Sequence, residues 1–381
     1  MNYLQYIKKQ QGIEPTRFLL SGMDIGVRQL LGQHMIHFCQ EQELTLFIVD
    51  HTQEDRFFTI PDLDFHVIRV PNDKVMLCSD LLEAVSLYDV SRIRVLLSGL
   101  GFQESRIMKV ITYLRFVKET QYRLGDHGPL RIATLETYGS MHLVEEKLRQ
   151  LERKGALSAE NVDYLMGRYS EISREAAEFE TFLIMLEPFL EGKIPDLHTI
   201  IHLPFGSFDA DAGMQKLISR LMISYMKEHP GQCAMLILDD GMGERDFLID
   251  ILSHVPGSMP VYLLSDDAFS LDDQQINIVM NAFPIRIYTR HADMRSCAKV
   301  AECCGQIDVI HKAYTVTVDH HLKANSAWDM LLGTNHSESE IRNAPVKEYR
   351  FPKETIHAMA EGTGIIDCKG SKVWFAFDHN A

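Results

Sequence analysis

The chain has 381 residues, of which 46% are hydrophobic and 24% are charged, a composition typical of a globular protein with a large core. Its formal net charge of −15 argues against a protein that grips DNA by itself, because such proteins usually present a basic face. No apolar run reaches the ~18 residues that a membrane-spanning helix needs, and the polar start lacks a signal-peptide core. We therefore expect a cytoplasmic protein that associates with a membrane only through partners.

The cysteines are seven in number, dispersed, and none of them forms a C-x-x-C pair. An odd, scattered set in mostly apolar surroundings predicts reduced thiols in the core and not a disulfide framework. This pattern also favours a reducing compartment.

The hydrophobic pattern changes twice along the chain. Residues 1–77 alternate between strand and helix patterns, with strands expected at 17–21, 44–49 and 65–70. Residues 78–191 show mostly helical spacing, for example in the run of Ile107, Val110, Ile111, Leu114 and Val117. We therefore predict a helical insertion within an α/β domain.

The alternating pattern resumes over residues 192–381 and ends in a hairpin. Strands are expected at 199–203, 234–238, 261–264 and 285–288, and helices at 211–228, 244–254, 270–281 and 292–304. The closing hairpin is expected to pair residues 364–366 with 373–377. Strands that alternate with helices indicate a mostly parallel sheet, so the predicted fold class is α/β with an inserted all-α subdomain.

The segment Gly22–Gln29 follows the first predicted strand and precedes a helix expected at 30–41. The next strand ends in an acid, Asp50. This is the setting of the nucleotide-binding P-loop, G-x-x-x-x-G-K-[ST], whose backbone cradles phosphates. The candidate nucleotide-binding residues are Gly22, Gly26, Arg28 and Gln29.

The loop keeps the setting of that motif but loses most of its residues. Val27 replaces the second glycine, and a β-branched residue resists positive φ where the ligand must approach. Arg28 keeps the charge of the lysine in a larger, planar group. Gln29 offers an amide oxygen but no hydroxyl for magnesium. An ordinary strand–turn–helix without a ligand therefore remains open.

Two acids, Asp239 and Asp240, end the apolar strand that begins at Met235. Ligands of open α/β sheets bind outside such strand ends. Asp239 is the candidate magnesium ligand, through water, and Asp240 is the candidate carboxylate that activates a water molecule. Asp240 is one methylene shorter than the usual glutamate, and a plain acidic turn is the alternative reading.

The order of these parts resembles the FtsK/HerA-type P-loop ATPases, in particular the conjugative coupling proteins of type IV secretion. The parts are the loop Gly22–Gln29, the helical insertion, the acidic strand 234–240, the strand 261–264, Pro284–Tyr288 and the closing stretch 348–366. The resemblance implies a RecA-like P-loop domain, often hexameric, that uses ATP and magnesium in DNA or protein transfer.

The same resemblance suggests further roles for individual residues. Arg286 or Arg290 would be an arginine finger that acts on a neighbouring subunit, with a plain charge at a strand end as the alternative. Ser265-Asp266-Asp267 stands where such enzymes place a polar sensor, and acids there would repel a bound phosphate.

These departures lead us to predict a pseudo-ATPase or scaffold subunit of a DNA-transfer or secretion assembly. Its partners would be other protein subunits, including copies of itself, and it would bind neither ATP nor magnesium. An active, atypical ATPase that uses Arg28 on phosphate and Asp239 on magnesium is the first alternative. A metal-dependent phosphoesterase built on Asp319, His320 and His321 is the second, because an acid and two histidines can hold a transition metal.

Overall fold

The computed structural model describes residues 17–52, 66–70, 72–130, 141–190, 192–205, 212–240, 246–310, 345–368 and 370–376. The described residues form two units. Unit 1 lies within Met1–Thr289 and Glu361–Ala381, and unit 2 lies within Arg290–Ala360. Asp319, His320 and His321 lie outside the described residues, so the phosphoesterase reading stays an untested prediction.

Unit 1 is built on a nine-stranded sheet in the order β11-β10-β7-β1-β6-β5-β2-β4-β3. The strands are β1 (Arg17–Ser21), β2 (Thr45–Asp50), β3 (His66–Arg69), β4 (Thr199–Pro204), β5 (Cys233–Asp239), β6 (Val261–Ser265), β7 (Ile285–Tyr288), β10 (Thr363–Cys368) and β11 (Ser371–Ala376). The strands from β7 to β3 in this order are parallel, whereas β10 and β11 run antiparallel to their neighbours. The predicted mostly parallel sheet and the closing hairpin are confirmed.

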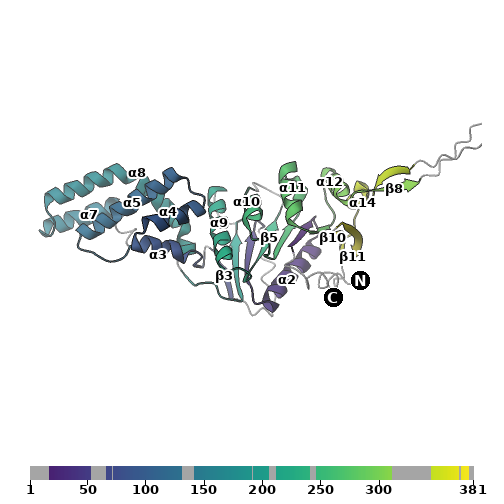
Figure 1. The fold of residues 1–381 in the computed structure, drawn as a ribbon, viewed down its shortest axis with the longest axis horizontal. Coiled ribbons are helices and arrows are strands. Elements are labelled where there is room, and N and C mark those ends of the chain that lie inside the picture. Colours follow the sequence, from purple (N-terminus) through teal and green to yellow (C-terminus); the bar gives the residue numbers. More distant parts are fainter. Residues whose placement is uncertain are drawn as a thin grey trace, which may run out of the picture. The chain divides into compact units, whose positions relative to one another are not determined.

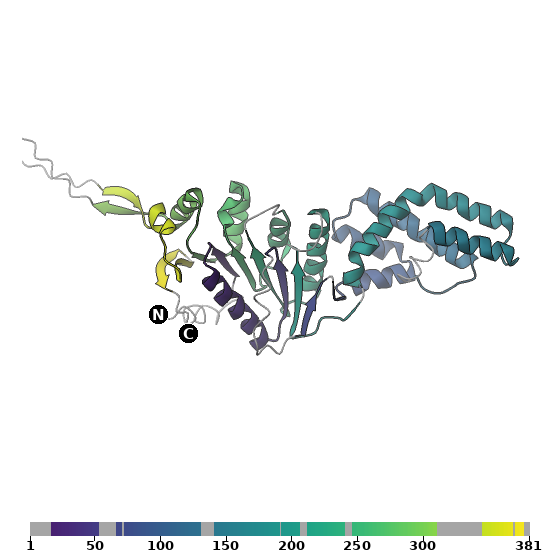
Figure 2. The ribbon, with the colours of Figure 1, turned by 180° about the vertical axis from the view of Figure 1, so that it is seen from behind.

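Helices cover both faces of this sheet (Figures 1 and 2). Helix α2 (Ile25–Glu41) lies on one face. Helices α9 (Ala212–Glu228), α10 (Asp246–His254) and α11 (Asp273–Ala282) lie on the other, and a short 3-10 turn, η2 (Ala268–Ser270), follows β6. The right-handed crossovers of parallel strands place helices in this way.

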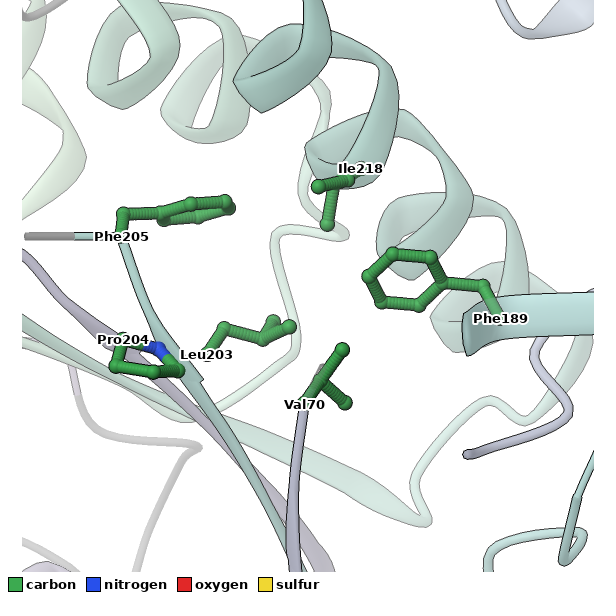
Figure 3. Close-up of a pocket in the computed structure, with 6 residues that line it drawn as sticks. All are labelled: Val70, Phe189, Leu203, Pro204, Phe205 and Ile218. Atoms are coloured by element: carbon green, nitrogen blue, oxygen red, sulfur yellow. The ribbon is translucent and has the colours of Figure 1, made fainter. Parts of the chain in front are cut away.

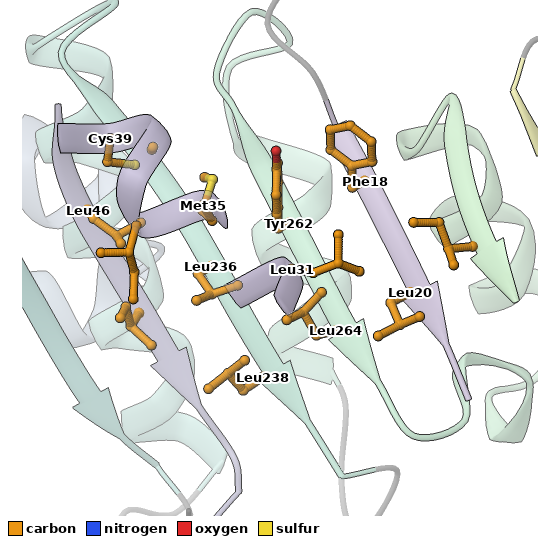
Figure 4. Close-up of a cluster of buried hydrophobic side chains, with 14 of the residues drawn as sticks. Phe18, Leu20, Leu31, Met35, Cys39, Leu46, Leu236, Leu238, Tyr262 and Leu264 are labelled. Atoms are coloured by element: carbon orange, nitrogen blue, oxygen red, sulfur yellow. The ribbon is translucent and has the colours of Figure 1, made fainter. Parts of the chain in front are cut away.

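In the core beneath α2, the inward-facing side chains of the strands pack against one face of the helix (Figure 4). Alternate residues of the central strands point to the same face, and they include Phe18, Leu20, Leu236, Leu238 and Leu264. Leu31, Met35 and Cys39 follow the helical spacing of α2 and pack onto them. This packing fixes the start of α2 above the carboxyl ends of the strands.

A series of helices separates β3 from β4 in the chain. They are α3 (Ser79–Leu87), α4 (Val90–Gly99), α5 (Glu104–Arg123), α7 (Met141–Arg153) and α8 (Ala159–Leu190). The predicted helical character of this stretch is thus observed, while its domain boundaries at 78 and 191 stay predictions. Of the helices in the described residues, none is both long and apolar enough to cross a membrane.

A small hollow lies where the end of α8 approaches the sheet (Figure 3). Its lining is entirely apolar: Val70, Phe189, Leu203, Pro204, Phe205 and Ile218. A lining without charged or polar side chains gives a polar ligand nothing to bind, so this hollow is a packing feature.

Unit 2 contains a helix pair and a two-stranded ribbon among its described residues. Helix α12 (Met294–Cys304) packs against α14 (Lys353–His357). Strands β8 (Gln306–Ile310) and β9 (Pro345–Tyr349) pair in antiparallel fashion.

Candidate functional site

The predicted loop and the predicted acidic strand meet at the carboxyl edge of the sheet. Strand β6 lies between β1 and β5, so Ser21 is in register with Ser265, and Ser265 is in register with Asp239. This is the edge at which ligands bind in open α/β sheets. The local sequence pattern contains no information on which strands are neighbours.

The loop itself is shorter than predicted, which corrects the expectation of a helix that begins at residue 30. Helix α2 begins at Ile25, and Gly26, Val27, Arg28 and Gln29 lie in its first turns. Asp24 is the N-cap, because its side chain accepts the N–H of Val27 at 3.0 Å. Only Gly22, Met23 and Asp24 therefore link β1 to α2.

Gly22 is the one residue that matches the P-loop motif, and the sheet already uses its amide. Its φ of 137° lies in the region that favours glycine. Its N–H donates to the carbonyl of Ser265 at 3.0 Å. This amide is therefore directed at β6.

Asp24 places a carboxylate at the N-terminus of α2. Its residue is 8% exposed, and its Oδ2 accepts the N–H of Gly362 at 2.6 Å while Oδ1 accepts that of Val27. A helix N-terminus attracts anions, including phosphate, through its amides and dipole. Here the chain supplies that anion itself.

The two other substituted motif positions also have internal partners. Val27 is fully buried in the cluster beneath α2, beside Leu31. Arg28 forms an ion pair with Asp266, and the two side chains are 10% and 33% exposed. Sequence reasoning expected Arg28 to face a phosphate and Asp266 to repel it, and missed that the two would pair.

Asp239 is almost completely buried, at 1% exposure, and accepts a hydrogen bond from the Ser265 hydroxyl. Asp240, the next residue, is partly exposed. Two groups that normally complete a magnesium–nucleotide site are missing here, since Gln29 in the first turns of α2 has no hydroxyl and the link Gly22–Asp24 is too short for a glycine-rich phosphate loop. The described residues thus do not fit a P-loop magnesium site, and the described chain contains no cluster of three metal-ligating side chains.

Arg286 lies inside unit 1 and has three acceptors. Its guanidinium donates to the carbonyls of Met280 and Phe283 and to Asp367, at 2.7, 3.0 and 3.2 Å respectively. These contacts join β7 to β10 and to the end of α11. Arg290, the other candidate arginine finger, is exposed at the start of unit 2. The finger role of either residue stays a prediction.

A second buried polar pair, missed from the sequence, lies on neighbouring strands. His202 of β4 and Asp50 of β2 are each 2% exposed, and their side chains are 3.3 Å apart. Thr52 donates to Asp50 through both its N–H and its hydroxyl, at 2.7 Å. The sequence does contain a signal for this pair, since His202 is a polar residue within the apolar run Thr199–Pro204.

Solved structures share this fold, although no protein-family model and no curated protein sequence matches the chain. One is the unbound bacterial conjugative coupling protein TrwBdeltaN70, with a TM-score of 0.50 and 11% identity over 97% of this chain and 86% of that one. The chain shares the fold of TrwB. TrwB in complex with the GTP analogue GDPNP gives the same TM-score and identity, over 97% of this chain and 87% of that one.

A further match is VirB4 of Thermoanaerobacter pseudethanolicus, with a TM-score of 0.42 and 8% identity, over 96% of this chain and 90% of that one. The TrwB matches confirm the predicted fold resemblance. At 11% identity they bear on the fold alone.

Proposed function

We propose that this protein is a scaffold subunit of a DNA-transfer or secretion assembly, descended from a P-loop ATPase and no longer able to bind nucleotide. Its fold is that of TrwB, a plasmid coupling protein whose complex with a GTP analogue has been solved. The observation that carries the loss of binding is the Asp24 carboxylate at the N-terminus of α2.

A phosphate at this helix terminus would have to displace Asp24 or lie beside it. Two unit charges of the same sign at ~4 Å repel by about 4 kcal/mol at the effective dielectric constant near a protein surface. Displacement would remove the cap from Val27 and the acceptor from Gly362. Both routes oppose nucleotide binding.

The contacts of Arg28 and Val27 also oppose nucleotide binding. Arg28 would have to leave Asp266, and this would expose an acid to the incoming phosphate. Val27 cannot turn outward without leaving the core, and a cavity in its place would destabilise the fold. An active ATPase that uses Arg28 and Asp239 would need both changes at once.

The partners in this proposal are the protein subunits of the assembly, including further copies of this chain. Membrane association, where it occurs, would be through those partners. Direct contact with DNA is disfavoured by the net charge of −15.

Titration calorimetry of the full chain with magnesium-ATP tests this proposal. The wild-type protein is expected to release no binding heat up to millimolar nucleotide. A variant with Asp24→Gly, Arg28→Lys and Gln29→Thr, which keeps Val27 in the core, serves as the comparison. Micromolar affinity in the wild-type protein would refute the proposal and favour the active ATPase.

A further inference from the structure

The short connection Ser21–Asp24 is bonded to both points where the chain crosses between the two units. The chain leaves unit 1 after Thr289 and returns at Glu361. These crossings are far apart in sequence, yet the last unit 1 residue before the departure, Thr289, and the second unit 1 residue after the return, Gly362, both donate their N–H to this one connection between β1 and α2.

The departing crossing is held by the main chain. The N–H of Thr289, directly after β7, donates to the carbonyl of Ser21 at 3.0 Å. Both residues are fully buried. A bond between buried backbone groups resists opening, because each group would be left without a partner.

The returning crossing is held by a side chain. Gly362 follows the first residue of the returning segment, is buried, and donates its N–H to Asp24 Oδ2 at 2.6 Å. Its φ of 71° is in the left-handed region, which glycine adopts without strain. Hydrogen bonds to a charged acceptor are shorter and stronger than those between neutral groups.

The connection Ser21–Asp24 is also hydrogen-bonded to β6, to Ala268 and to α2. Gly22 donates its N–H to the Ser265 carbonyl, and the Ser21 hydroxyl accepts the N–H of Ala268 at 3.1 Å. Asp24 is bonded to the first turn of α2 through Val27. The connection is thus tied to β6 and α2 and is not a free loop.

We propose that Ser21–Asp24 is a ligand-independent clamp within unit 1, which holds the end of the departing segment at Thr289 and the start of the returning segment at Gly362. The Asp24 carboxylate bridges the N-terminus of α2 and Gly362, the residue directly before β10, as an anion bound there would. Nucleotide is therefore not needed to order this part of the sheet. The clamp rests on these contacts and not on the proposed function.

Hydrogen exchange of the full chain, resolved to single amides, tests the clamp with Asp24→Asn. Asparagine is an equally good N-cap, so its oxygen retains the bond to Val27. Its NH₂ group is a donor and cannot accept the N–H of Gly362. Exchange at Gly362 is expected to accelerate by about tenfold or more, the effect of losing one hydrogen bond to a charged group. The first turn of α2 should be unchanged.

The matched control is Asp272→Asn, because Asp272 is an exposed N-cap that accepts the N–H of Gln275. It should leave the exchange of Gly362 at the wild-type rate. Equal exchange at Gly362 in the wild-type protein and Asp24→Asn would overturn the clamp.

The wild-type protein gives a second test that needs no variant. Gly362 should exchange far more slowly than Gly125 and Gly155, which are exposed in turns. Equally fast exchange at the three glycines would also overturn the clamp. Nucleotide binding by the wild-type protein would refute the scaffold proposal and leave these exchange rates as the measure of the clamp.

Discussion

The hydroxyl of Ser265 donates a 2.7 Å hydrogen bond to the carboxylate of Asp239 across the adjacent ends of β6 and β5. Asp239 is almost fully buried, and a buried carboxylate is destabilising unless it is hydrogen-bonded. The bond therefore gives this acid a structural role that needs no metal.

Asp239→Asn is predicted to leave transfer or secretion efficiency nearly unchanged in cells, because the amide oxygen still accepts from Ser265. In a working ATPase, loss of this acid would remove several kcal/mol of transition-state stabilisation. Each ~1.36 kcal/mol is tenfold in rate, so efficiency would fall by orders of magnitude. Efficiency is measured with protein abundance followed by blot. A collapse at normal abundance would contradict the scaffold proposal.

Comparing Asp239→Ala with Asp239→Asn tests whether the carboxylate of Asp239 stabilises the fold through its hydrogen bond with Ser265. It leaves the buried Ser265 hydroxyl without this acceptor, so we expect a loss of about 1–3 kcal/mol in the free energy of unfolding. Urea denaturation of Asp239→Ala and Asp239→Asn measures the difference. Equal stability of the two variants would argue against the structural role of the bond.

Arg286→Ala is predicted to lower the free energy of unfolding by about 1–3 kcal/mol, because the buried Asp367 loses its guanidinium partner and keeps only Lys372, at 3.7 Å, as a cation. Arg286→Lys should recover only part of this, since an ammonium cannot reach three acceptors at once. The control is the exposed Arg290→Ala, with an effect within about 0.5 kcal/mol. Normal stability of Arg286→Ala with loss of transfer would instead support an arginine finger.

Asp24→Ala is predicted to destabilise unit 1 more than Asp89→Ala, although both residues are N-caps. Asp89 is exposed and accepts the N–H of Arg92, so its loss should cost about 1 kcal/mol. Loss of Asp24 also leaves the buried N–H of Gly362 without its acceptor, which adds about 1–3 kcal/mol. Chemical denaturation of the two variants compares them, and an equal loss would contradict the prediction.

The buried thiols make stability depend on alkaline pH. None of the seven cysteines forms a disulfide and all but Cys303 are buried, as the sequence predicted. Burial raises the pKa of Cys233 to about 12, and burial together with the neighbouring Cys233 raises that of Cys39.

An unfolded thiol ionises near pH ~8.5, so the unfolded state releases its proton first. The stabilising contribution of Cys233 is therefore complete below that pH and is lost as the pH rises toward about 12. Cys233→Ala should lose less stability than the wild-type protein between neutral and alkaline pH in urea denaturation. Identical pH dependence of the two proteins would contradict this assignment.

The P-loop motif led to a wrong prediction for the start of α2, which lies at Ile25 and not at residue 30. The motif placed Gly22–Gln29 in a loop, yet Asp24 is a strong N-cap residue directly before a helical pattern. Local capping chemistry, which the sequence does contain, predicts the observed start at Ile25. The motif match at Gly22 alone was too weak to outweigh it.

In unit 1, the order of strands and helices, the helical stretch after β3 and the closing hairpin were determined by the sequence alone, whereas β8, β9 and α14 of unit 2 were not predicted. They follow from the hydrophobic period of each segment, which is a local property. Only the tertiary structure decided that Arg28 pairs with Asp266, that Ser265 bonds Asp239 and that Gly362 bonds Asp24. Each of these contacts joins residues distant in the chain, and they meet because β6 inserts between β1 and β5 and the chain returns beside α2. Such neighbours are set by the packing of the whole sheet, which no local pattern encodes.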